Sequence, residues 1–331
     1  MNTKDRIMVQ SSPLFYLKTL WQLHIRKRPV VLSHGINSSC NLRCSFCDYW
    51  MEERDEMSTE EIFDLLREAR SFGILFYNAW TTEPLLREDL PEILEYAHQL
   101  GMITSLITNG KLLEERIDDL EHLDYLSVSV DGIRTHKQIR GLDFAAILPG
   151  IVKARDKFHK KILINCVISN KNLTDIEDLV KLVQDLNLKI SFEPVHEFKS
   201  IDKKTWEEFG IDNRQEYEKI VDRLIEMKKE GYPIINSITY LSMVKNLDLN
   251  YRCHASDIIL NVTSDGEVEH CRVRKKSIGN IREGITNIWD RSDNTRKHLT
   301  SSCEGCLFFG YVENSLLYEF RPEVIKNYEW M

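Results

Sequence analysis

The sequence lacks the features that would place it in a membrane or outside the cell. No part of its 331 residues forms an apolar run of 18, the length that marks a transmembrane helix. The N-terminal apolar segment is interrupted by Lys18, Gln22 and His24, and no small-residue cleavage site follows it, so it is not a secretory signal. We therefore expect a cytoplasmic protein, whose cysteine thiols stay reduced.

A surplus of basic residues is also missing. The formal net charge of −8 excludes a bulk attraction to nucleic-acid phosphates, so we expect no nucleic-acid partner. Apolar residues make up 42% and charged residues 29% of the chain, which is typical of a soluble globular protein. A chain of this length buries a sufficient core without disulfides. The eight cysteines therefore favour metal or cluster ligation.

From Val30 to Pro194 short apolar segments alternate with amphipathic segments. The apolar segments predict strands at residues 30–36, 73–80, 102–108, 125–130, 161–168 and 188–194. Helices are predicted between them, and N-terminal capping signals begin at Ser58, Asp89 and Thr174. Six such repeats predict an α/β fold with a parallel sheet and helices outside it, either an open doubly wound sheet or a partial barrel.

Polar side chains follow the ends of these predicted strands, and active sites of such folds lie at the carboxyl ends of the strands. They are Cys40, Cys44, Cys47, Glu83, Asn109, Asp131 and Glu193.

Beyond Pro194 the pattern changes. Residues 203–230 predict a charged amphipathic helical region, and a domain boundary is expected near 232–250. Further on, a turn at Ser264-Asp265-Gly266 lies between two short apolar segments and predicts a β-hairpin.

The loop after the first predicted strand holds three cysteines, Cys40, Cys44 and Cys47, but no fourth. Thiolates bind zinc as well as iron–sulfur clusters, although structural zinc usually takes four ligands. Three thiolates in one tight loop suit a four-iron cluster with one iron open to a substrate or cosubstrate. Three merely buried cysteines are the remaining alternative.

The segment CNLRCSFC resembles the C-x3-C-x-φ-C signature of the radical S-adenosylmethionine (radical SAM) superfamily, with Phe46 at the aromatic position. The resemblance covers about residues 30–200 and implies a partial (β/α)6 TIM-like barrel. We then expect an N-terminal helical segment at 1–29, a radical SAM core at 30–232 and a small C-terminal α+β domain at 233–331.

The segment TTEPLL (81–86) occupies the place of the Gly-Gly-Glu-Pro motif that meets the SAM ammonium group in this family. A carboxylate and outward-facing carbonyls suit an ammonium group. Thr81 and Thr82 replace the two glycines, and positive φ angles there would strain both β-branched residues. The alternative for Glu83 is an ordinary surface carboxylate.

The segment SVSVDGIRTHKQIRG resembles the fourth-strand segment of the same superfamily. This implies that Ser129 and Asp131 lie near the SAM ribose and that Arg140 lies near the SAM carboxylate, which an arginine fork suits. A turn at Asp131 and a solvated Arg140 are the alternatives. The full set implied for SAM is Phe46, Thr81, Thr82, Glu83, Asn109, Ser129, Asp131, Arg140 and Asn165.

Four of the remaining cysteines form a second set. Cys253 and Cys271 flank the predicted hairpin, and Cys303 and Cys306 form a C-x2-C pair. Zinc could occupy such a four-thiolate site. The C-x12-G-x4-C opening also resembles the SPASM-type auxiliary-cluster domain, and Val312 stands where its two-cluster form has a further cysteine. The short, one-cluster "twitch" form is thus implied, with a second [4Fe–4S] cluster. Cys166, in a predicted strand, is expected to be a buried thiol.

The resemblance implies a function. A three-cysteine [4Fe–4S] cluster, reduced by an electron from a flavodoxin- or ferredoxin-type protein under anaerobic conditions, is expected to cleave SAM to a 5′-deoxyadenosyl radical. This radical abstracts hydrogen from, or adds to, a small-molecule or lipid intermediate. A maturase of a peptide or protein is one alternative, and fewer than 40 residues before Cys40 leave no room for a leader-binding module. A non-catalytic iron–sulfur electron-transfer protein is another.

Each of two basic segments has two possible interpretations. Residues 14–28 mix large apolar residues with lysine and arginine, and predict either a contact with a membrane surface or a helix that closes the barrel. Residues 271–277, CRVRKKS, predict either a solvated hairpin edge or a contact for a phosphate or an acidic electron donor.

Overall fold

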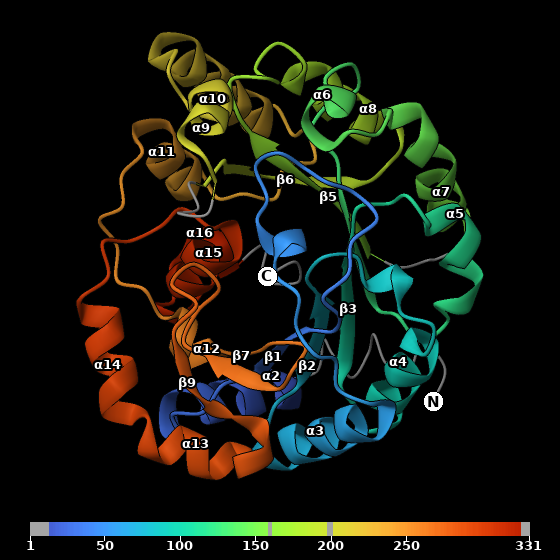
Figure 1. Ribbon diagram of the computed structural model, residues 1–331. Coiled ribbons are helices and arrows are strands. Elements are labelled where there is room, and N and C mark those ends of the chain that lie inside the picture. The colour runs from blue at the N-terminus through green and yellow to red at the C-terminus, as the bar shows by residue number, and fades with distance from the viewer. Residues whose placement is uncertain (1–12, 158–160, 197–200, 326–331) are drawn as a thin grey trace.

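A computed structural model describes residues 13–157, 161–196 and 201–325, and its centre is one curved nine-stranded sheet (Figure 1). The strand order is β6-β5-β4-β3-β2-β1-β7-β8-β9, with parallel pairing from β6 to β7. The strands are β1 Val31–Gly35, β2 Phe76–Trp80, β3 Ile103–Thr108, β4 Tyr125–Ser129, β5 Lys161–Ile168, β6 Lys189–Pro194, β7 Ile259–Val262, β8 Glu267–Glu269 and β9 Ser277–Asn280. The expected partial (β/α)6 barrel is confirmed, because β1 to β6 follow one another in space as in sequence.

Helices surround the sheet, as the crossover rule predicts (Figure 1). They are α2 Pro13–Leu20, α3 Thr59–Phe72, α4 Leu90–Gln99, α5 Leu113–Arg116, α6 His136–Arg140, α7 Phe144–Lys157, α8 Ile176–Asp185, α9 Lys203–Phe209, α10 Arg214–Lys229, α11 Ile238–Asn246, α12 Ala255–Ile258, α13 Ile285–Arg291, α14 Asp293–Ser301, α15 Phe309–Tyr318 and α16 Pro322–Ile325. Their apolar faces and the outer strand positions, such as Tyr77 and Ala79, form the main core.

The start of α3 confirms one predicted capping signal. Ser58 accepts a hydrogen bond from the Glu61 backbone, and the Glu61 carboxylate accepts one from the Ser58 backbone. The other two signals are wrong. The Asp89 carboxylate binds Arg87 and Thr59 instead of capping α4, and α8 begins after Asp175 without a side-chain cap. Tertiary partners therefore compete successfully with local capping.

The C-terminal hairpin extends the barrel sheet. The predicted turn at 264–266 connects β7 and β8, which pair antiparallel, while β7 pairs parallel with β1. Helix α15 lies between β6 and α12 on the side where the curved sheet is open (Figure 1). The C-terminal segment and the six-stranded barrel thus share one sheet, and the proposed domain limits at 29 and 232 stay a prediction.

The N-terminal basic segment forms α2 and a short π-helix at Trp21–Ile25. The Gln22 amide attaches it to the barrel through hydrogen bonds to the Phe72 and Pro29 carbonyls. Its outer face exposes large apolar side chains, namely Leu14, Leu17, Leu20, Trp21 and Ile25. Among the described residues, no helix combines the length and the hydropathy needed to cross a membrane.

Candidate functional site

The cysteine loop begins where β1 ends, so its thiols lie at the carboxyl ends of the parallel strands. The Leu42 backbone N–H points at Cys40 Sγ at 3.5 Å, and Asn109 Nδ2, after β3, lies 3.9 Å from the same sulfur. The Cys47 backbone N–H donates to the Cys44 carbonyl at 3.2 Å, which folds the second half of the loop into a turn. Donors directed at sulfur favour the thiolate form, which is the form that binds iron.

Electrostatics in the loop also suit a bound cluster. Burial raises the pKa of Cys47 to about 12 and also raises the pKa values of Cys40 and Cys44. The nearby Arg140 guanidinium opposes this shift at Cys44 and Cys47. Each thiol must lose its proton when it binds iron, and one positive charge beside two of them lowers that cost. The three thiols and their surroundings therefore fit a three-cysteine cluster.

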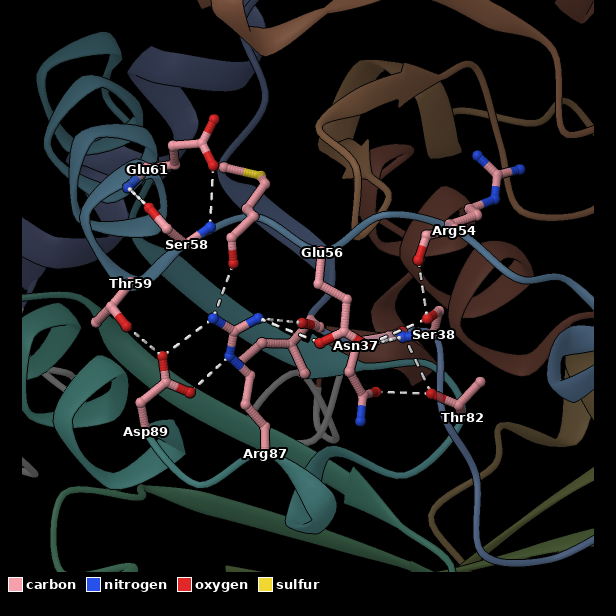
Figure 2. Close-up of polar contacts among 12 residues, drawn as sticks. Asn37, Ser38, Arg54, Glu56, Ser58, Thr59, Glu61, Thr82, Arg87 and Asp89 are labelled. Carbon is pink, nitrogen blue, oxygen red and sulfur yellow. Dashed lines mark hydrogen bonds and ion pairs between the residues drawn. The ribbon is translucent and has the colours of Figure 1, made fainter.

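Arg87, after β2, ties both ends of the cysteine loop to the barrel (Figure 2). Its guanidinium donates to the Ile36 carbonyl before the loop and to the Met57 carbonyl after it, each at 2.9 Å. The Asp89 carboxylate holds the guanidinium in place at 2.7 Å. Nothing in the sequence marked Arg87, because its partners are backbone carbonyls that only the fold brings together.

The segment that follows β2 has the left-handed backbone expected for glycine. The φ angles of Thr81 and Thr82 are 81° and 46°. The Thr82 hydroxyl donates to Asn37 Oδ1 at 2.6 Å (Figure 2), whereas the buried Thr81 hydroxyl has no hydrogen-bond partner within the described residues. A β-branched residue is strained in this region, so the chain adopts this left-handed path at an energetic cost.

Replacing Thr81 with glycine should stabilise the protein. The left-handed conformation costs about 1–2 kcal/mol for a side-chain-bearing residue, and glycine adopts it freely. Allowing for the greater freedom of glycine in the unfolded chain, we expect Thr81→Gly to raise the unfolding midpoint, measured by thermal denaturation, by about 1 °C. Thr81→Ala is the control, since it removes the hydroxyl but keeps the φ cost. An equal rise in both variants would show that the hydroxyl, and not the backbone, is responsible.

Glu83 is fully buried and its carboxylate is engaged within the chain. It accepts hydrogen bonds from the Leu85 backbone, the Thr108 hydroxyl and the Asn109 backbone, at 3.1, 2.7 and 2.7 Å. Burial raises its pKa to about 7, although these three donors oppose the shift. Glu83 therefore joins the loops after β2 and β3 and holds residues 81–86 in position. The alternative of a surface carboxylate is wrong.

Asp131 and Arg140 form a buried ion pair at the end of β4. Arg140 Nε and Nη2 lie 2.6 and 3.3 Å from the two Asp131 oxygens, and the Val167 backbone donates to Oδ1 at 2.9 Å. The Arg140 guanidinium also faces the Phe46 ring at 5.4 Å. The alternative of a solvated Arg140 is wrong, because its side chain is buried beside the cysteine loop.

The remaining implied SAM residues lie on the same edge of the sheet. Ser129 ends β4, and Asn165 pairs with it in register on β5. The Asn165 amide accepts from the Ser191 hydroxyl at 2.7 Å and donates to the Glu193 carboxylate at 3.4 Å. Among the implied SAM residues, Asn109 and Arg140 contact the cysteine loop, and Ser129 and Asn165 lie beside each other on β4 and β5.

The second set of cysteines also comes together. Burial raises the pKa values of Cys253, Cys271 and Cys306, and neighbouring cysteines of the same set, among them Cys303, add to the shifts of Cys253 and Cys271. The Arg274 backbone N–H points at Cys271 Sγ at 3.3 Å, and the Tyr251 hydroxyl lies 3.8 Å from Cys306 Sγ. Within the described ranges, no three Cys, His, Asp or Glu side chains converge on a single metal ion. A four-iron cluster binds each cysteine through a different iron, so its ligands need not converge in this way.

A solvated hairpin edge at 271–277 is wrong for Arg272 and Lys275. Lys275 Nζ lies 3.0 Å from Asp48 and 2.6 Å from Glu52 in the cysteine loop. The Arg272 guanidinium stacks on the Trp80 ring at 3.5 Å, and its carbonyl accepts from the Tyr49 hydroxyl. These contacts connect the two groups of cysteines.

The sequence patterns did not mark Trp80 or Tyr49 as site residues, whereas Arg272 lies in the segment 271–277, for which a contact with a phosphate or an acidic electron donor was one of two predictions. Trp80 and Tyr49 read as ordinary residues of a strand end and a loop, and Arg272 as one of several basic residues. The nearest signal was that Arg272 directly follows Cys271.

The two groups of cysteines on this α/β barrel define a protein with two thiol-rich sites, one of them at the carboxyl ends of the parallel strands. Comparison with known proteins agrees. The family model "Radical SAM superfamily" matches residues 36–183, and the SPASM "iron-sulfur cluster-binding domain" matches residues 253–307. The chain is 32% identical over 311 residues to an "Fe-coproporphyrin III synthase" of Methanosarcina barkeri, covering 83% of this chain and 77% of that relative. The chain therefore belongs to the radical SAM superfamily.

Two further proteins resemble the chain, one in sequence and one in fold. A "Probable GTP 3',8-cyclase" of Saccharolobus solfataricus is 29% identical over 265 residues, covering 75% of this chain and 83% of the relative. The crystal structure of Streptococcus suis SuiB bound to S-adenosylmethionine has a similar fold, with a TM-score of 0.65 at 15% identity, over 87% of this chain and 72% of SuiB. The protein is thus an enzyme that uses SAM, a SAM-binding [4Fe–4S] cluster and an auxiliary cluster.

Proposed function

We propose that Cys40, Cys44 and Cys47 hold the SAM-binding cluster. Cys253, Cys271, Cys303 and Cys306 then hold the auxiliary cluster. The bound cluster and SAM supply the 5′-deoxyadenosyl radical. The chain contributes the backbone carbonyls of the Thr81 segment for the SAM ammonium group and the Arg140 guanidinium for the SAM carboxylate. Asp131 and Glu83 hold these two elements in position through the contacts described above.

The inner face of the barrel supports a small polar substrate. Along β2, Tyr77 and Ala79 are completely buried against the helices, so Asn78 and Trp80 face inward. The same alternation and the strand registers place a belt of polar side chains on the inner face, namely Ser33, Asn78, Ser105, Ser127, Asn165, Ser191, Glu193 and Asn261. Cross-strand hydrogen bonds, such as Ser105 to Asn78 at 2.9 Å, join several of them.

This polar belt is the single observation that carries the proposal. A lipid chain in the barrel would bury these hydroxyl, amide and carboxyl groups against hydrocarbon, which costs free energy. A hydrophilic molecule instead offers them hydrogen bonds. The names of the two relatives, a synthase of Fe-coproporphyrin III and a GTP cyclase, agree with small polar substrates. We therefore propose hydrogen abstraction from a small water-soluble molecule inside the barrel, with a flavodoxin- or ferredoxin-type protein as electron donor.

Formation of 5′-deoxyadenosine tests this assignment. The reconstituted protein is incubated anaerobically with SAM and a strong reductant, and the host extract is added as separate lipid, protein and small water-soluble fractions. We expect the small water-soluble fraction to give the burst of 5′-deoxyadenosine. A burst with the lipid fraction alone would favour a membrane-derived substrate and a docking role for the exposed apolar face of α2. A burst with the protein fraction alone would favour a peptide or protein maturase.

A further inference from the structure

A small cavity opens between the ends of β1, β2 and β7, and buried polar groups face it without a partner. Its lining includes Gly35, Trp80 and Asn261. Asn261 is only 2% exposed, yet its amide oxygen and nitrogen have no hydrogen-bond partner among the described residues. The same is true of the buried indole Nε1 of Trp80. Buried polar groups in proteins are nearly always hydrogen-bonded, so these atoms are typical of a surface that binds a polar ligand group.

Arg272 adds a positive charge next to this cavity, behind the Trp80 ring that lines it. Its guanidinium stacks on Trp80, and its Nη2 donates to Ser33 Oγ at 2.5 Å. Its buried Nε has no hydrogen-bond partner within the described part of the chain. Ser33 pairs in register with Asn261 across β1 and β7. Arg272, Trp80 and Asn261 therefore meet around Ser33 on the inner face of the barrel.

The other charged groups of the cavity neutralise one another. Glu52 and Glu269 line it, and Arg54 lies 3.2 Å from the first carboxylate and 3.6 Å from the second. Lys275 lies 2.6 Å from Glu52. In residues 13–157, 161–196 and 201–325, Arg272 makes no ion pair, so its charge is available to a ligand.

Glu193 faces the same lumen from β6 and attracts Arg272 without touching it. Its carboxylate already accepts hydrogen bonds from the Phe309 backbone at 3.1 Å and from Asn165 at 3.4 Å. It therefore does not replace the ligand that the Arg272 guanidinium would bind.

We propose that Arg272, Trp80 and Asn261 form a subsite for an oxyanion group of the substrate, either a carboxylate or a phosphate. The free N–H groups of Arg272 and Trp80 can only donate, so the group they bind must accept hydrogen bonds. A guanidinium binds carboxylates and phosphates best. This inference rests on the proposed function and names the substrate class: an anionic small molecule held between the SAM-binding edge and the auxiliary cysteines.

Binding of simple anions tests the subsite directly. The anaerobic holoenzyme with both clusters is titrated in a calorimeter with sodium propionate, methyl phosphate and the uncharged propionamide. We expect one of the two anions to bind at least about tenfold more tightly than propionamide, a difference that a guanidinium contact easily supplies. Preference for propionate indicates a carboxylic acid as substrate, and preference for methyl phosphate indicates a phosphate ester.

Two variants localise the effect. Arg272→Gln should lower the anion affinity at least about tenfold and leave SAM affinity unchanged. Trp80→Phe keeps the stacked ring and removes only the indole donor, so it should weaken anion binding about threefold to tenfold. Arg274→Gln is the matched control, because its guanidinium contacts the Leu299 carbonyl and the Ser302 hydroxyl instead of the cavity.

Equal anion affinity in the wild type and in Arg272→Gln would overturn the subsite, as would a wild type that does not prefer anions to propionamide. Loss of SAM binding in Arg272→Gln would also overturn it, since the residue would then serve the cosubstrate. The proposed function fails separately. If small water-soluble molecules elicit 5′-deoxyadenosine and Arg272→Gln leaves their KM unchanged, the subsite fails and the proposed function stands.

Discussion

Cys44→Ala should reduce SAM cleavage to the background level and remove one cluster. Cys44 lies in the centre of the cysteine loop, and the Arg140 guanidinium lies beside its thiol. Two thiolates cannot hold a four-iron cluster that needs three protein ligands, so SAM loses the iron it would bind. The iron content should fall from about eight to about four atoms per chain, because the auxiliary cluster remains. Anaerobic 5′-deoxyadenosine formation and iron analysis measure both effects.

Two cysteine variants serve as controls. Cys166 is a fully buried thiol in β5 that belongs to neither group of cysteines, so Cys166→Ala should retain both the iron and the cleavage activity. Cys253→Ala should lose the auxiliary iron and still cleave SAM slowly without substrate. Undiminished cleavage by Cys44→Ala would contradict the assignment of the loop, and loss of cleavage in Cys166→Ala would show that the assay reports folding alone.

Asp131→Asn should strongly destabilise the protein and weaken SAM binding. The substitution leaves the Arg140 charge buried next to the cysteine loop without its carboxylate partner. Breaking one side of a buried ion pair costs about 3–5 kcal/mol of unfolding free energy. Arg140 also loses the contact that orients its guanidinium, so, if Arg140 binds the SAM carboxylate as proposed, the SAM affinity should fall at least about tenfold. Denaturant unfolding and calorimetry of the anaerobic protein measure the two quantities.

The exposed pair of Arg134 and Asp178 gives the matched control for this prediction. The two side chains are 59% and 45% exposed and lie 2.8 Å apart. Asp178→Asn removes the same charge, but water screens this exposed ion pair, so the unfolding free energy should change little. If Asp131→Asn lowered the unfolding free energy and the SAM affinity no more than Asp178→Asn does, the buried ion pair would not stabilise the proposed SAM site.

The barrel could be predicted from the sequence because its strands are short apolar segments between amphipathic helices. The structure confirms all six predicted strands with shifts of a few residues at their ends. The cysteine loop was equally visible, since its three thiols are close in sequence. The positive φ angles of Thr81 and Thr82 could also be predicted, because they follow from the place of the two residues in the motif and not from the conformational preferences of threonine.

Residues whose role depends on tertiary contacts could not be predicted in this way. Arg87 acts through two backbone carbonyls that lie on either side of the cysteine loop. The sequence left Arg272 open between a solvated edge and an anion contact, because the pairing of β7 with β1 joins segments more than 200 residues apart and the contact of Arg272 with Trp80 depends on the fold. Asp89 failed as a cap because its carboxylate binds Thr59, which is distant in sequence, and the neighbouring Arg87 instead of the helix backbone.

Deuterium transfer into 5′-deoxyadenosine tests the central claim most directly, namely that the polar lumen presents a small water-soluble molecule to the radical derived from SAM. The wild-type enzyme is incubated with unlabelled SAM and with extract fractions from host cells grown in deuterated medium. The mass of the 5′-deoxyadenosine formed is then measured by mass spectrometry. The small water-soluble fraction should give 5′-deoxyadenosine that carries deuterium, because the hydrogen comes from the substrate. Product without deuterium in this fraction, together with labelled product in the lipid or protein fraction, would contradict the account.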